Sequence, residues 1–288
     1  MTDAPSPVPP APVGRHDAVR CHDAWLRDDL PAWGTAARAL FWVALEVPGP
    51  WGRTAATESH LDPEFGQWLD QWCSSRGGRL VLVRRPGRHA DAHHMASRTL
   101  LIASSLAGRP WLGGVEASDP DELRARLDAL GDQVLTLTAD RHPDWLADQP
   151  GALLVCTNAK RDQCCALVGR PIAAAVEQLA PGRVWECSHL GGHRFAPTVL
   201  ALPTGQVFGR VGVELAEQVL ADLDAGVVST TSAWHDRGRS HLPPADQVAD
   251  IAVRLGLAGT PVQVDAGELP ESCGKSAVPV SVWRLDAG

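Results

Sequence analysis

The sequence has no apolar run long enough to cross a membrane. A spanning helix needs roughly 20 predominantly apolar residues, whereas the most apolar segments, residues 39–45 and 152–156, are far shorter. Residues 1–14 are rich in Pro and Ala and lack the basic and apolar regions of a secretory signal peptide. We therefore expect a cytoplasmic protein that makes no membrane contact and begins with a disordered tail over residues 1–20.

Clustered positive charge and an even set of cysteines are also missing. The formal net charge of -8 at pH 7 disfavours nucleic acid as a partner, since binding to phosphates needs clustered Lys and Arg. The short basic runs at residues 84–88 and 237–239 predict a solvated loop or the partner of a carboxylate on a neighbouring domain, with a docking patch for an acidic redox partner as the alternative. Seven cysteines are an odd number without an export signal, so we expect reduced thiols. No pair of carboxylates stands out as the acid and nucleophile of a glycosidase.

What the chain does contain is one order of predicted elements that occurs twice. The first set comprises a strand at 39–47, a helix at 61–72, strands at 79–84 and 99–103, an extended piece near 110–112 and a helix at 118–130. The second set comprises a strand at 152–156, a helix at 165–179, a strand at 184–187, a hairpin at 198–210 and a helix at 213–223. This order predicts an α/β protein with two thioredoxin-like units, each a βαβ element plus hairpin plus helix.

The domain boundaries follow from this segmentation. We place the first unit at residues 21–145 and expect it to carry no metal ligands, because nothing like a cysteine loop precedes its helix. The second unit, residues 146–288, carries the candidate metal site and ends in an appended helix at 243–255 and extended pieces at 261–265 and 277–284.

The most specific signal is a set of two thiols and two imidazoles in the second unit. Cys156 ends a predicted strand, and Cys165 begins a predicted helix whose dipole and free N–H groups stabilise a thiolate. His189 and His193 flank two glycines, which permit a tight turn that can bring both rings to one metal. Thiolate and imidazole ligands favour zinc or an iron-sulfur cluster over magnesium or calcium.

These residues by themselves leave three functions open. Zinc knuckles usually hold their cysteines two to four residues apart, so the wider loop from Cys156 to Cys165 weakens a structural zinc site and could surround a larger centre. Cys164 is an alternative to Cys165 as the second ligand. Cys164 and Cys165 could also serve a metal-free thiol oxidoreductase, although adjacent cysteines bridge poorly. The remaining cysteines that we interpret as ordinary core or surface thiols are Cys21, Cys73 and Cys273.

Most of the chain after about residue 20 resembles the sucrase/ferredoxin-like family. The segments that carry the resemblance are residues 34–36, 46–53, 156–165, 184–194 and 237–240. The resemblance implies a thioredoxin-like ferredoxin domain that binds a [2Fe-2S] cluster through Cys156, Cys165, His189 and His193. It also implies an electron carrier that serves an unidentified redox partner, more than an enzyme with a substrate of its own.

Ligation by two cysteines and two histidines would determine the redox behaviour. A [2Fe-2S] core of charge about +2 carries about -2 overall with four thiolates but about 0 with two thiolates and two neutral imidazoles, so its potential is higher. Because a bound imidazole can keep or lose its second proton, we expect the potential to fall as pH rises. Arg161 and Arg194 are candidates for hydrogen bonding or charge compensation beside the cluster, although a surface salt bridge is the simpler role for either.

Overall fold

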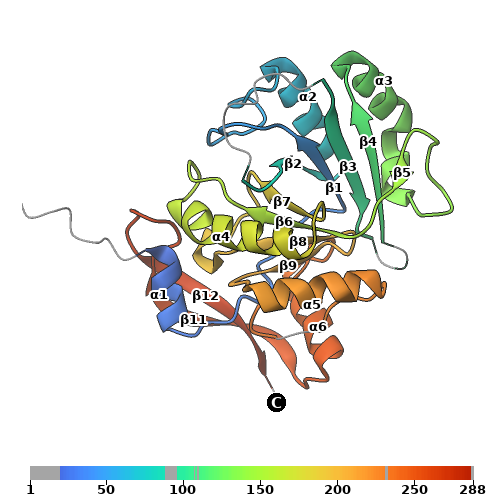
Figure 1. Ribbon diagram of the computed structural model, residues 1–288. Helices are drawn as coiled ribbons and strands as arrows, with labels where there is room; N and C mark the ends of the chain where they lie inside the picture. Colours follow the sequence, from blue (N-terminus) through green and yellow to red (C-terminus); the bar gives the residue numbers. More distant parts are fainter. Residues whose placement is uncertain (1–19, 88–95, 107, 109, 231–232, 287–288) are drawn as a thin grey trace, which may run out of the picture.

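The computed structural model describes residues 20–87, 96–106, 108, 110–230 and 233–286. The predicted disordered tail lies, except for Arg20, outside these residues. The described chain is a mixed α/β fold with one ten-stranded sheet and a separate two-stranded sheet (Figure 1). None of its helices is both long and apolar enough to cross a membrane.

The ten-stranded sheet contains the same strand order in each half. In the first half, β1 (Phe41–Glu46) lies between the parallel β2 (Arg79–Arg84) and the antiparallel β3 (Arg98–Ser104), followed by β4 (Trp111–Ala117) and β5 (Ala147–Asp148). In the second half, β6 (Ala152–Cys156) lies between the parallel β7 (Val184–Cys187) and the antiparallel β8 (Val199–Leu202), followed by β9 (Gln206–Phe208) and β10 (Asp236–Arg239). The repeated order of elements expected from the sequence is therefore present.

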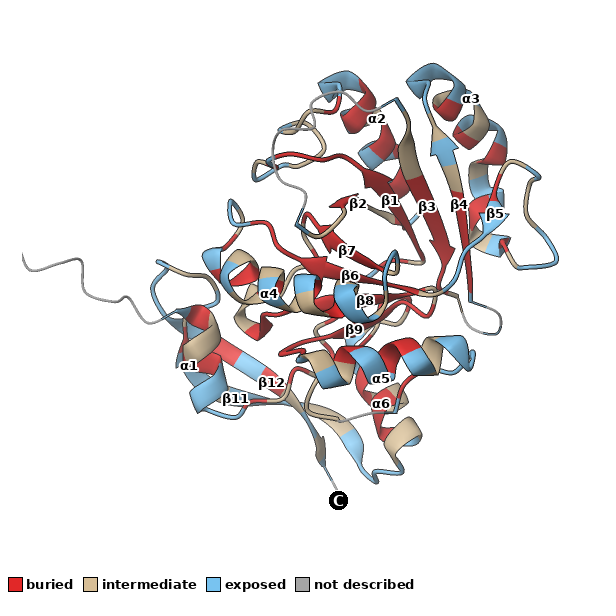
Figure 2. Cartoon of the chain, viewed as in Figure 1, coloured by how far each residue is buried: buried red, intermediate tan, exposed pale blue. Residues whose placement is uncertain are grey.

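Helices cover the outer face of each half-sheet (Figure 1). The covering helices are α2 (Pro63–Ser74) and α3 (Pro120–Leu130) in the first half, and α4 (Gln163–Leu179) and α5 (Val213–Asp224) in the second. Helix α2 begins two residues later than predicted because Asp62 caps it, accepting a hydrogen bond from the backbone N–H of Phe65 at 2.8 Å. Figure 2 shows that these helices are buried on the side that faces the strands and exposed on the other.

The inner faces of the two half-sheets share one apolar core. Trp42 and Ala44 of β1 belong to the same buried cluster as Leu154 and Cys156 of β6. The halves are joined where β2 pairs with β7, over only two residue pairs. The candidate ligand Cys156 therefore lies at the end of a strand, on the face between the halves.

The remaining elements enclose the lower part of the second half (Figure 1). They are α1 (Cys21–Arg27), α6 (Pro244–Leu255), β11 (Thr260–Leu269), β12 (Val278–Asp286) and the 3₁₀ helix His193–Phe195. A second 3₁₀ helix, Gly131–Thr136, follows α3 and packs into the core of the first half. Trp25 of α1 and Val282 of β12 are buried against Phe195. Phe195 lies two residues after the candidate ligand His193. The sequence did not predict α1 or β10.

Candidate metal centre

The ends of β6 and β7 and the start of α4 bring the predicted ligands into one region. Cys156 is the last residue of β6 and Cys165 lies in the first turn of α4, and both are 1% exposed. Helix α4 can approach the strand this closely because Gly169 has no side chain: a Cβ there would lie 2.5 Å from the carbonyl oxygen of Cys156. Strand β7 ends at Cys187, which is in register with Cys156.

The two cysteine side chains interact directly. A hydrogen bond from Cys165 lowers the pKa of Cys156 well below its ordinary value, with help from His189 and from the backbone N–H of Leu190, although burial acts in the opposite sense. The same hydrogen bond, together with burial, raises the pKa of Cys165. The two side chains therefore act on each other in opposite directions, which favours the thiolate form of Cys156 and the thiol form of Cys165.

The two histidines lie on a tight turn that only glycine forms readily. Gly191 and Gly192 have φ values of +76° and +69°, in the left-handed region. This turn stacks the rings of His189 and His193, with their centroids 6.2 Å apart. The tight turn that the two glycines were expected to form is present, and the binding of both rings to one metal stays a prediction.

Both rings have an unused nitrogen. The Nδ1 atoms of His189 and His193 are buried and have no hydrogen-bond partner among the described residues, an arrangement that costs free energy unless something else binds them. Burial also lowers the pKa of His193, which favours the neutral ring that can bind a metal. Two sulfurs and two free imidazole nitrogens are the donor set that zinc and iron-sulfur centres accept, so these residues fit such a group.

Arg237 holds the histidine turn in place by hydrogen bonding, a role that the sequence did not indicate. Its guanidinium donates to the carbonyl oxygen of Gly191 at 3.0 Å and to the side chain of Thr35 at 3.0 Å. Burial lowers the pKa of Arg237 to about 9, while Cys156 and Cys165 act to raise it, so the side chain remains cationic at neutral pH. The segment 237–240 carried the family resemblance, but the interpretation of its basic run as a solvated loop is wrong for Arg237, which is buried.

The first half of the chain braces the loop that follows Cys156. Glu186 of β7 accepts hydrogen bonds from Arg84 of β2 at 2.9 and 2.6 Å and from Thr157 at 2.9 Å. The Asn158 side chain donates to the carbonyl oxygen of Gly52 at 2.9 Å. Arg84 thus has a carboxylate partner on the other half, which was one of the sequence interpretations of its basic run.

The side of the site that faces solvent is a hollow of about 430 Å³. His189 and His193 line it together with Arg161, whereas Arg194 forms an ion pair with Glu271 at 3.1 Å and lies over the ring of Trp25. Arg194 therefore has the salt bridge that was the simpler of its two expected roles. The rest of the lining comes from Arg53, from the loop between β11 and β12, and from the first residue of β12; the loop and strand residues are Glu271, Ser272, Lys275, Ser276 and Val278.

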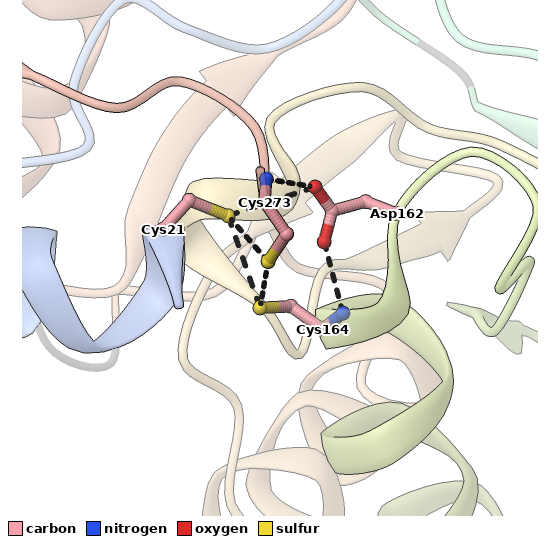
Figure 3. A group of neighbouring side chains, drawn as sticks. All are labelled: Cys21, Asp162, Cys164 and Cys273. Carbon is pink, nitrogen blue, oxygen red and sulfur yellow. Dashed lines mark hydrogen bonds between the residues drawn. The ribbon is translucent and has the colours of Figure 1, made fainter. Parts of the chain in front are cut away.

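Cys164 faces away from this set and belongs to a second group. Its sulfur lies 3.8 Å from that of Cys21 and 3.1 Å from that of Cys273, and the carboxylate of Asp162 is beside them (Figure 3). Adjacent cysteines on a helix point in different directions, so Cys165 faces Cys156 while Cys164 faces α1. The interpretation of Cys21 and Cys273 as ordinary thiols did not anticipate this convergence. Cys73, in contrast, is buried in the core of the first half.

Comparison with known proteins assigns the family. Comparisons with curated proteins and with solved structures gave no match. The family model described as sucrase/ferredoxin-like matches residues 32–234, more than half of the chain, and this range contains the four predicted ligands. The chain therefore belongs to the sucrase/ferredoxin-like family.

Proposed function

We propose that this protein is an electron carrier that binds a [2Fe-2S] cluster through Cys156, Cys165, His189 and His193. The observation that carries the proposal is the convergence of two buried sulfurs with two buried, unpartnered imidazole nitrogens. A cluster bound there would supply one-electron chemistry. In the same proposal, the two halves are thioredoxin-like units, because each has a parallel strand pair at the centre and an antiparallel hairpin at one side.

The surrounding residues perform two tasks in this proposal. The apolar core between the half-sheets excludes water from the two sulfurs, which are both almost fully buried. Arg237 places a buried positive charge near Cys156 and Cys165 and holds the carbonyl oxygen of Gly191, which orients the histidine turn. A nearby cation favours the reduced, more negative state, so Arg237 should raise the potential.

The side of the site with the imidazoles is the route for electrons. His189 and His193 line the hollow, whereas Cys156 and Cys165 lie in the interior. Arg53, Arg161 and Lys275 also line the hollow, so a redox partner with an acidic surface would dock there most readily.

The test is elemental analysis together with visible spectroscopy on anaerobically purified full-length protein. We expect two irons and two sulfides per chain with a red-brown colour, and loss of at least nine tenths of the iron in Cys165→Ser. Cys73→Ala is the matched control, because it removes a buried cysteine from the other half; it should keep iron and colour. Wild-type protein that is free of iron even after reconstitution, or Cys165→Ser with full iron content, would refute the proposal.

A further inference from the structure

Beside the proposed cluster site, three cysteines and one aspartate from distant parts of the chain meet at one point, and the aspartate, Asp162, lies 3.8 Å from the Nε2 atom of His193. Cys21 begins α1, Asp162 and Cys164 lie at the start of α4, and Cys273 lies in the loop between β11 and β12 (Figure 3). The three sulfurs and a carboxylate oxygen of Asp162 all lie within 4.8 Å of one another. Cys21 and Cys273 are 252 residues apart in sequence, so no local chain geometry explains their contact.

The spacing of the sulfurs is that of ligands around one ion. Zinc–sulfur bonds of about 2.3 Å place neighbouring thiolates of a tetrahedron about 3.8 Å apart. Cys21 lies 3.8 Å from Cys164 and 3.6 Å from Cys273, and its sulfur is 3.7 Å from the carboxylate of Asp162. The Cys164–Cys273 distance of 3.1 Å is shorter but well above a disulfide bond of about 2.05 Å. A disulfide would also use only two of the three sulfurs.

Hydrogen bonds from Cys21 and Cys273 lower the pKa of Cys164 to about 7, whereas the hydrogen bond to Cys164 and burial raise the pKa of Cys21, and burial raises that of Cys273 to about 11. Other neighbours favour negatively charged sulfur. The backbone N–H of His22 donates to Cys164, and that of Cys21 donates to Cys273. Arg20 and Arg194 are close enough to interact electrostatically with the sulfurs of the group. Hydrogen bonds and cations of this kind stabilise thiolates, the form in which cysteine binds metals.

The carboxylate of Asp162 is already positioned by the chain. Its oxygens accept hydrogen bonds from the backbone N–H groups of Cys164 at 2.9 Å and Cys273 at 2.7 Å, and from the Ser272 hydroxyl at 2.9 Å. Its side chain has no solvent exposure. A carboxylate held in this way keeps lone pairs for a metal, and its orientation needs no further ordering.

We propose that Cys21, Cys164, Cys273 and Asp162 form a second metal site, which binds one structural Zn²⁺. Three thiolates and one carboxylate complete the four-coordinate shell of a closed zinc site and leave no position for a substrate. The ion would tie α1 and the loop between β11 and β12 to the start of α4, one residue before Cys165. Since that loop lines the hollow over His189 and His193, zinc would limit solvent access to the proposed cluster.

The test measures zinc, iron and sulfide together in full-length protein expressed with added zinc and purified without chelator. We expect one zinc per wild-type chain, and an at least tenfold fall in zinc in Cys21→Ala and in Cys273→Ala, with iron and sulfide retained. Cys273 is partly exposed, so its replacement leaves the core intact. Cys165→Ser should show the opposite pattern, in which iron falls and zinc stays. Cys73→Ala should change neither.

Several outcomes would overturn the zinc site without touching the cluster proposal. Wild-type protein with less than a tenth of an equivalent of zinc would do so, as would full zinc content in both Cys21→Ala and Cys273→Ala. A Cys164–Cys273 disulfide in mass spectra of the native protein would show a redox pair instead. Conversely, zinc without iron in the wild type, lost in Cys273→Ala, would support this site and refute the cluster. EDTA should bleach the visible absorption several-fold faster in Cys273→Ala than in wild-type protein. An unchanged rate would refute the idea that zinc limits solvent access to the hollow.

Discussion

Replacing Glu186 with alanine should destabilise the protein by about 3–5 kcal/mol, the typical cost of leaving a buried charge unpaired. The side chains of Glu186 and Arg84 are only 2% and 5% exposed, and two hydrogen bonds of 2.9 and 2.6 Å join them. Without the carboxylate, the contacts of Arg84 in the part of the chain that the structure describes would be the carbonyl oxygen of Gly49 and the ring of Trp51. The assay is urea unfolding followed by both tryptophan fluorescence and circular dichroism.

A double-mutant cycle isolates the pair. Arg84→Met with Glu186→Leu should cost about 2–3 kcal/mol less than the sum of the two single changes, because the double variant leaves no unpaired charge. Glu122→Ala is the control: this half-exposed carboxylate pairs with Arg126 within α3, and such surface pairs contribute about 0.5 kcal/mol or less. If Glu186→Ala lowers the free energy of unfolding no more than Glu122→Ala does, the ion pair between β2 and β7 does not stabilise the contact between the halves.

Three further predictions concern the turn, the buried histidines and the potential. The urea concentration at the unfolding midpoint should be lower for Gly192→Ala than for Gly226→Ala. Both glycines have a φ near +68°, but only a Cβ at Gly192 would lie against another side chain, 2.3 Å from Arg237. Equal midpoints would contradict this close contact. Burial lowers the pKa of His22, His193 and His241 below 6.5, so the unfolded chain binds more protons and stability should fall as pH drops below about 6.5. His241→Phe should flatten that loss between pH 7.5 and 5.5 in urea unfolding, and an unchanged slope would exclude this contribution. The midpoint potential should fall with rising pH in wild type and become flatter in His193→Cys; a potential in wild type that does not vary at alkaline pH would count against histidine ligation.

The secondary structure could be predicted from the sequence because its signals are local. Strand β6 and its partner β7 are short apolar runs between turns, and their predicted bounds of 152–156 and 184–187 match the structure. Helix α4 began two residues earlier than expected because Asp162, rather than a residue next to Cys165, caps it. Helix α1 has only seven residues and no side-chain cap, so it had no periodic signal to detect.

The candidate site could be predicted only in part, since its supporting contacts are distant in sequence. The spacing of the cysteines and histidines was enough to nominate four ligands. Arg237 reaches the histidine turn from 46 residues away, and Cys21 meets Cys273 across 252 residues. Strand pairing and tertiary packing create such contacts, and a single sequence does not encode them in any local pattern.

Pulsed EPR of the reduced protein, with histidine labelled with ¹⁵N, tests the proposed ligation most directly. An unpaired electron on iron couples strongly only to nitrogens bound to that iron, so the spectrum reports the ligands themselves. We predict couplings to two histidine nitrogens, one of which disappears in His193→Cys while the iron and sulfide remain. A paramagnetic cluster with no strong histidine coupling, or the same two couplings in His193→Cys, would contradict ligation by Cys156, Cys165, His189 and His193.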